Sequence, residues 1–166
     1  MNILSTFLNS CNVSHIVIAA SKKPSSGADD SNQRHPKQIV PDMFRANKVD
    51  GLTDETKIVA FSLLAAIASG TPFQELESIG ISVPNSPTKL RFHFDKMPGN
   101  QNFKGIRYTR YIDHSANKHW RFYYIVGSSH VALLDIFDKD SNKIDKNQVT
   151  RLVSLIRKFK NQSGER

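Results

Sequence analysis

The clearest periodic pattern in the chain lies in residues 51–70, where apolar side chains recur every three or four positions. This spacing is typical of an amphipathic helix that packs against a core. Thr53 can cap the start of the helix, and Asp54 and Glu55 place negative charge in its first turn. Gly70 can end it. The sequence therefore predicts a scaffold helix with a buried stripe of Ile58, Phe61, Leu64 and Ile67.

Alternating apolar and polar positions in the second half of the chain predict β-strands. Short segments rich in turn-forming residues separate these runs, as they do in an antiparallel sheet of neighbouring strands. Residues 71–87 end in two closely spaced prolines and predict irregular structure. The predicted strands are 89–94, 103–112, 120–126 and 130–137.

A second amphipathic helix is predicted near the end of the printed sequence. Asp145 can cap it, and Gln148 stands three residues later, as in a capping box. Its apolar face consists of Val149, Leu152, Val153, Ile156 and Phe159. The order of helix, strands and helix predicts a small α+β domain, in which helices pack on one face of an antiparallel sheet.

The first 40 residues differ in character from the rest of the chain. Residues 14–20 predict one short strand, whereas residues 21–38 are rich in Ser, Pro, Gly and Asp and lack periodicity, which indicates a linker. We therefore expect an N-terminal extension over 1–40, a folded domain over 41–160 and a C-terminal tail over 161–166.

Length and composition limit the classes of protein to which this chain can belong. A length of 166 residues suits a single domain, and a hydrophobic content of 39% leaves room for one unstructured segment. No run of 18 apolar residues is present, so we expect no membrane span. The single cysteine, Cys11, has no partner for an internal disulfide or a cysteine-based zinc site. A cytoplasmic protein is the simplest interpretation.

The net charge of +8 is concentrated in one part of the chain. Residues 104–166 contain 13 Lys and Arg against 6 Asp and Glu, whereas residues 1–103 contain 10 against 9. Such a concentration fits a surface for phosphates or for an acidic protein, although a lysine-rich surface without a ligand has the same charge.

Three segments together resemble the RelE/ParE superfamily of toxins, in particular its RelE-like and HigB-like branches. WRFYYIV resembles the arginine-bearing strand of these toxins, and HVALLDIFDKDSNKIDKNQVTRLVSLI resembles the strand and helix that follow it. VDGLTDETKIVAFSLLAAIASG is similar to the helix before the sheet. The resemblance covers roughly residues 43–158, while the first 40 residues have no counterpart in it.

The resemblance implies a fold with helices on one side of a small antiparallel sheet and a basic concave face on the other. It also implies an endoribonuclease that cleaves mRNA, commonly at the ribosome, and a cognate antitoxin protein as partner. A ParE-like inhibitor of DNA gyrase is the first alternative. A basic module that binds RNA or a protein partner is the second.

Cleavage of RNA without a metal requires cations for the phosphate and groups that transfer protons. Arg121 matches the strand arginine of the family and is the first candidate to hold the phosphate, since its planar group meets two oxygens. Arg107 and Arg110 lie three positions apart on one predicted strand, so only one of them can share a face with Arg121. Lys139 matches the lysine that closes the last strand of the family. An Arg121 side chain that is buried against the core, or turned away from Arg107, Arg110 and Lys139 alike, would end the proposal that these cations share a surface for the phosphate.

Hairpin geometry provides a second test. A loop with an odd number of residues would place Arg121, Asp135 and Phe137 on one face, whereas an even number would place Arg121 opposite Leu134 and Ile136.

Proton transfer and base stacking need further side chains. His119 is the predicted acid or base, with His93 and His114 as other candidates. The residues predicted to bind RNA are Lys104, Tyr123 and Lys143, of which Tyr123 would stack on a base if Arg121 faces the groove. No cluster of His and Cys has metal-ligand spacing, so we expect neither a metal nor a small-molecule cofactor.

Overall fold

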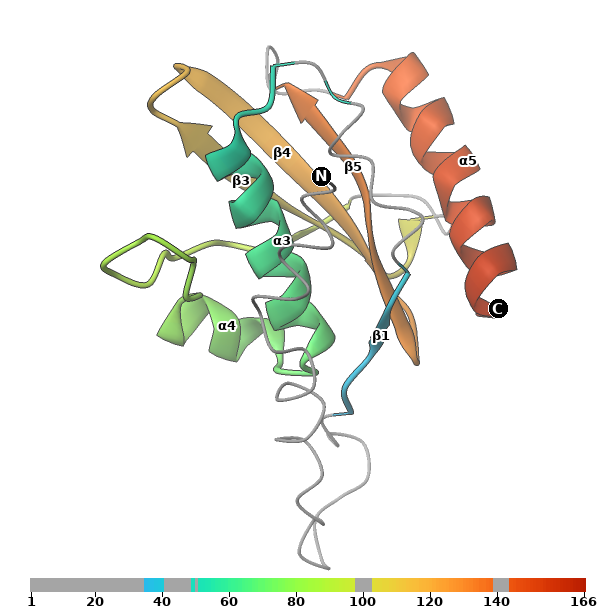
Figure 1. Ribbon diagram of the computed structural model, residues 1–166. Coiled ribbons are helices and arrows are strands. Elements are labelled where there is room, and N and C mark those ends of the chain that lie inside the picture. The colour runs from blue at the N-terminus through green and yellow to red at the C-terminus, as the bar shows by residue number, and fades with distance from the viewer. Residues whose placement is uncertain (1–34, 41–48, 50, 98–102, 139–143) are drawn as a thin grey trace, which may run out of the picture.

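A computed structural model describes residues 35–40, 49, 51–97, 103–138 and 144–166 of the chain. In these ranges the protein is an α+β structure with three helices and a five-stranded sheet (Figure 1). The helices are α3 (Asp54–Ala68), α4 (Phe73–Ile79) and α5 (Lys146–Ser163), and the strands are β1 (Gln38–Ile39), β2 (Asp95–Lys96), β3 (Ile106–Asp113), β4 (Lys118–Val126) and β5 (His130–Asp138).

The sheet has the strand order β1-β5-β4-β3-β2 and is mixed. Strands β2 to β5 pair antiparallel in sequence order, as the alternation of apolar residues predicts. Strand β1 pairs parallel with β5, through Gln38 opposite His130 and Ile39 opposite Val131. The predicted strand over 89–94 is wrong: only Leu90 of that run makes a bridge, to Ile81, and β2 begins at Asp95. The strand predicted over 14–20 lies outside the described residues.

Helices cover both faces of the sheet, so the expectation of helices on one face is wrong. Helices α3 and α4 pack on the face that presents Trp120, Phe122 and Tyr124 of β4. Helix α5 packs on the other face, against Tyr123 and Ile125 (Figure 1). The reason is that β4 and β5 carry apolar side chains on both faces, such as Phe122 on one face and Ile125 on the other, so both faces must be buried.

The two long helices begin at the residues that the sequence predicts. The Thr53 hydroxyl accepts a hydrogen bond from the amide of Thr56, and Asp145 and Gln148 form the expected capping box. Each cap satisfies amide groups that would otherwise lack partners in the first turn. Helix α4 lies in the region that the sequence predicted to be irregular. The prediction missed this helix because it is short: Pro72 at its start and Gly80 at its end limit it to seven residues.

The folded part of the chain extends beyond both predicted boundaries. Strand β1 adds residues 38–39, which were expected in the N-terminal extension, to the edge of the sheet. Helix α5 continues to Ser163, and Glu165 binds the turn between β4 and β5. Residues 161–166 are therefore part of the domain and not a separate tail.

Candidate functional site

The hairpin of β4 and β5 contains a β-bulge that decides which side chains share a face. Val126 lies opposite Val131, with four residues between them, but Tyr123 lies opposite Asp135. Strand β5 therefore contains one extra residue, Leu134, relative to β4.

This bulge changes the partner of Arg121. With an even number of loop residues and no bulge, Arg121 would lie opposite Ile136. The extra residue in β5 places Arg121 opposite Phe137 instead. Arg121, Phe137 and Asp135 therefore share one face. The arrangement expected for an odd loop is present, and the bulge produces it.

The same face of β3 carries Arg110. Arg110 lies directly opposite Arg121, and Ile112 lies directly opposite His119. We call the surface made by Arg110, Ile112, His119 and Arg121 the Arg110 patch. Arg110 and His119 are exposed, and the Ile112 side chain is 44% exposed, so this end of the sheet is open to solvent.

Arg121 itself is buried, with only 6% of its surface exposed. Its guanidinium carbon lies 5.8 Å from the centre of the Tyr108 ring, on the face that α5 covers. Strand β4 has a neighbour on each side and helices on both faces, which leaves little space for solvent. The expectation that Arg121 holds the phosphate is therefore wrong, and Arg110 is the accessible arginine of the pair.

Arg107 is on the opposite face of the sheet, as the spacing of three residues requires. It lies opposite Tyr124, its guanidinium carbon is 4.7 Å from the centre of the Phe73 ring, and it donates a 3.4 Å hydrogen bond to the carbonyl of Phe94. The choice between Arg107 and Arg110, which the sequence left open, is settled by the structure in favour of Arg110 as the neighbour of Arg121.

Tyr123 is a core residue and not an exposed stacking surface. Its exposed fraction is 0%, and its ring centre lies 5.6 Å from that of Tyr108 and 5.2 Å from that of Phe137. Burial raises the pKa of its phenol, and the nearby Arg121 guanidinium opposes this rise. The expectation for Tyr123 is wrong because α5 covers this part of the face.

The remaining predicted residues do not join the Arg110 patch. Lys104 is exposed and lies before β3, where it lines a cavity beside the turn between β4 and β5. That turn is at the other end of β4 from His119. Lys139 and Lys143 lie outside the described residues.

Sequence reasoning missed an ion pair on the same face of the sheet as the Arg110 patch. The Asp135 carboxylate, which is 0% exposed, contacts Arg151 of α5, with 2.6 Å between Oδ2 and Nε. The Nη2 group of Arg151 also donates a 2.9 Å hydrogen bond to Oδ1. A carboxylate in the apolar run VALLDIF was the signal that could have identified this pair, since buried carboxylates are normally paired.

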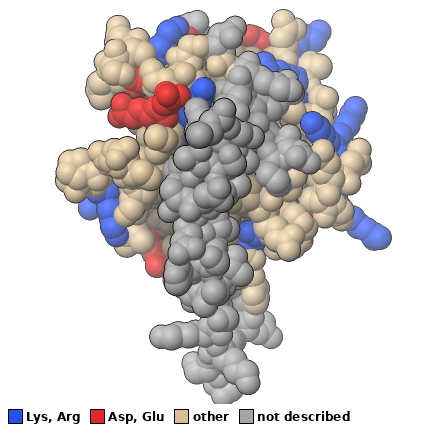
Figure 2. Space-filling model, in the orientation of Figure 1, with Lys and Arg blue, Asp and Glu red and all other residues tan. Residues whose placement is uncertain are grey.

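The acidic residues described after residue 103 are all bound to other groups of the chain. Asp138 pairs with Lys118, Asp145 caps α5, and Asp113 accepts hydrogen bonds from Thr53, Thr56, Ser115 and Ala116. These bonds hold the pKa of Asp113 well below its usual range, although burial opposes them. Figure 2 shows Lys and Arg side chains on the α5 side of the molecule.

In the ranges that the structure describes, no three His, Cys, Asp or Glu side chains form a group that could hold a metal ion. No helix in these ranges is long and apolar enough to cross a bilayer.

Comparison with known proteins supplies no relative for this chain. No family model, curated protein or solved structure matches it.

Proposed function

We propose that this protein is a toxin of the RelE/HigB type that cleaves mRNA without a metal ion. The observation that carries the proposal is the Arg110 patch, in which an exposed arginine and an exposed histidine share one face of neighbouring strands. The resemblance of WRFYYIV and the segments around it supports the same class of activity.

The spacing of the patch suits the chemistry. Arg110 and His119 are diagonal neighbours across β3 and β4, and such positions lie roughly 7–8 Å apart, with their Cβ atoms somewhat closer. A phosphate bound by Arg110 would therefore have its ribose within reach of the imidazole. His119 would take the proton of the 2′-hydroxyl, whose oxygen attacks the adjacent phosphorus as the bond to the 5′-oxygen breaks. The departing 5′-oxygen would take a proton from solvent water, and His119 would later return its proton to solvent. The products would be a 2′,3′-cyclic phosphate and a 5′-hydroxyl.

Arg121 would act as a positioning residue in this scheme. Arg121 lies directly opposite Arg110 on the neighbouring strand, so its side chain limits where the Arg110 side chain can lie. A phosphate at Arg110 would gain charge-assisted hydrogen bonds from the planar guanidinium of that residue. Buried Arg121 contributes to the field without touching the phosphate.

The proposed partners follow from the same assignment. The substrate would be mRNA, in the cytoplasm and at the ribosome, and a cognate antitoxin protein would cover the basic surface. The test is to induce the chain alone in a bacterial host and to map transcript ends. We expect growth arrest with new ends that carry 5′-hydroxyl groups. Growth arrest with intact transcripts, or no arrest at all, would contradict the proposal.

The burial of Arg121 favours one second candidate, a module that binds RNA or a protein partner without cleaving RNA. In such a module, Arg110 and the cations of α5 would supply affinity for RNA or for an acidic partner, and no proton transfer would take place. Binding of a short single-stranded RNA to the purified chain, with the strand recovered intact, would support this candidate over the toxin.

A further inference from the structure

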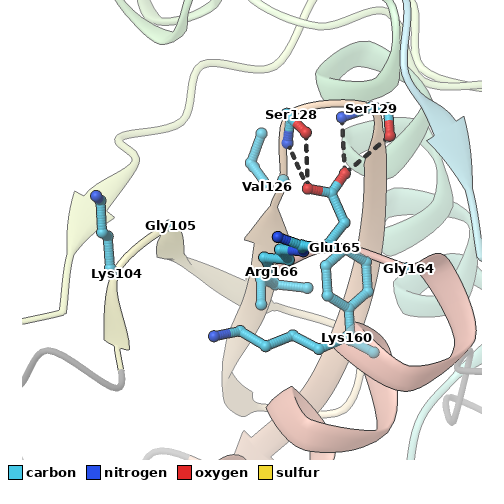
Figure 3. A pocket seen from close by; sticks show the side chains of 12 residues that line it. Lys104, Gly105, Val126, Ser128, Ser129, Lys160, Gly164, Glu165 and Arg166 are labelled. Carbon is cyan, nitrogen blue, oxygen red and sulfur yellow. Dashed lines mark hydrogen bonds between the residues drawn. The ribbon is translucent and has the colours of Figure 1, made fainter.

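The turn between β4 and β5 holds a carboxylate of the same chain in an unusually complete set of donors. The amides of Ser128, Ser129 and His130 donate hydrogen bonds of 2.9, 2.7 and 2.9 Å to the two oxygens of Glu165. The hydroxyls of Ser128 and Ser129 donate two more, of 2.8 and 3.0 Å (Figure 3). These bonds hold the pKa of Glu165 well below its usual range, although burial opposes them.

The backbone of the turn is shaped for a close approach of this anion. A Cβ atom on Gly127 would lie 2.6 Å from Oε1 and 2.7 Å from Oε2 of Glu165, so a larger residue there would force this carboxylate to move. Successive amides that point into one concavity form a type of site known to bind anions. The turn is therefore a preformed anion site that Glu165 occupies.

Positive side chains surround the site. Glu165 borders a cavity of about 650 Å³, and Lys104, Lys160 and Arg166 line the same cavity, with Ile125 and Phe159 in its apolar floor. Figure 3 shows the Lys160 side chain extending toward the side on which Lys104 lies. One carboxylate among three cations leaves an excess of positive charge.

The number of donors exceeds what a carboxylate accepts best. Two carboxylate oxygens offer about four lone-pair positions, whereas the turn presents five donors to Glu165. A phosphate monoester has three terminal oxygens and a charge of about −1.5 to −2 at neutral pH. It would accept all five hydrogen bonds and would neutralise more of the surrounding positive charge.

We propose that the turn Gly127–His130 is a binding site for a phosphate monoester, which displaces Glu165 and is held additionally by Lys104 and Lys160. This site is distinct from the Arg110 patch, because the turn follows the last residue of β4 and His119 is the second residue of that strand. Roughly 30 Å of extended chain separates the two. The proposal does not depend on RNA cleavage, so either can fail without the other.

The experiment is a titration of the full ¹⁵N-labelled chain, followed by the amide signals of Ser128, Ser129 and His130. The probes are inorganic phosphate, adenosine 5′-monophosphate and a short RNA with or without a 5′-phosphate. We expect each phosphate monoester, and inorganic phosphate, to shift the three signals. Equal affinity for phosphate and the nucleotide would show that the phosphate alone is recognised. Tighter binding of the nucleotide or of the phosphorylated RNA would identify the source of the ligand.

Variants separate the proposed site from general electrostatics. Glu165→Gln removes the charge of the competing group and is expected to strengthen phosphate binding at least about tenfold, because a tethered competitor acts at millimolar effective concentration or above. Gly127→Ala fills the concavity and should abolish the shifts. Lys104→Ala and Lys160→Ala should weaken binding, whereas Lys158→Ala, on an exposed side chain that does not line the cavity, should not.

Two results would overturn the proposal. One is the absence of shifts at the three amides in both the natural chain and Glu165→Gln, with the remaining signals showing a folded protein. The other is an equal loss of binding in Lys158→Ala and Lys160→Ala, which would indicate attraction to overall charge. If Glu165→Gln does not fold, the titration of the natural chain with the Gly127→Ala comparison decides the question.

Discussion

Arg151 of α5 and Asp135 of β5 form an ion pair in which the carboxylate is fully buried and the guanidinium is partly exposed, with 2.6 Å between Nε and Oδ2. The pair attaches the C-terminal helix to the sheet face that carries Arg110 and Arg121. The Arg151 guanidinium carbon also lies 5.6 Å from the centre of the Phe137 ring, opposite Arg121. The position of α5, and with it the burial of Arg121, depends partly on this contact.

The first prediction concerns the stability of this attachment. Arg151→Ala should lower the free energy of unfolding by about 3 kcal/mol, because it removes an ion-pair partner of a buried carboxylate. Lys118→Ala, which removes an exposed partner of Asp138, should cost less than about 1 kcal/mol. Urea unfolding of both variants measures the difference. Equal losses would contradict the role assigned to Arg151.

The second prediction tests the placement of Tyr123. Tyr123→Ala should destabilise the fold by about 3–5 kcal/mol, as truncation of a large buried side chain does. Tyr108→Ala removes a ring that is only partly buried and should cost clearly less. A loss below about 1 kcal/mol for Tyr123→Ala in chemical denaturation would mean that the residue is exposed, as the sequence had suggested.

The third prediction separates the two arginines of β3. If the proposed cleavage occurs, Arg110→Ala should reduce it by about 10²-fold or more, since a cation beside the reacting phosphate is removed. Arg107→Ala is the matched control, because Arg107 points to the face of α3 and α4. It should leave the rate nearly unchanged once stability is taken into account. Rates of RNA cleavage by the purified variants decide, and a larger effect at Arg107 would contradict the assignment.

The fourth prediction concerns His119. On the proposed mechanism, His119→Ala should lower the cleavage rate by about 10²–10⁴-fold, the range for a lost proton-transfer group. Free imidazole in the assay should restore part of the activity, an effect that a merely structural residue would not show. His114→Ala, on an exposed residue of the turn between β3 and β4, provides the comparison. Activity that persists in His119→Ala would remove this residue from the mechanism.

The fifth prediction is a dependence of stability on pH. The folded-state pKa of Asp113 is lowered, so its contribution is fully present above the unfolded pKa of about 4 and is lost as the pH falls below that value. Asp113→Asn should cost about 2 kcal/mol at neutral pH and should show a smaller decline between about pH 4 and pH 2. Thermal unfolding at several pH values measures this. Part of the decline should remain, because the pKa of Glu165 is lowered as well.

Local patterns in the sequence were sufficient for the elements of this protein. The stripe in residues 51–70 and the cap at Asp145 predicted α3 and α5, because helix formation depends on side chains three or four positions apart. The alternation of apolar and polar residues predicted β3, β4 and β5, because successive side chains of a strand point to opposite faces of the sheet. The short elements were missed or misplaced: β1 and β2 have two residues each, too few to show a period.

The candidate site was predicted only in part. The sequence predicted that Arg107 and Arg110 point to opposite faces of the sheet, because they lie three positions apart on one strand. Which of them accompanies Arg121 depends on the register of β3 against β4, which is a long-range pairing.

What the sequence by itself determined is the identity of the helices and strands, since these depend on interactions between residues close in the chain. The tertiary structure alone decided that α5 covers the second face of the sheet and buries Arg121 and Tyr123. It also decided that Glu165 occupies the turn at Ser128–His130, more than 30 positions away. The physical reason is that packing and register join distant segments, and no local pattern of residues specifies their partners.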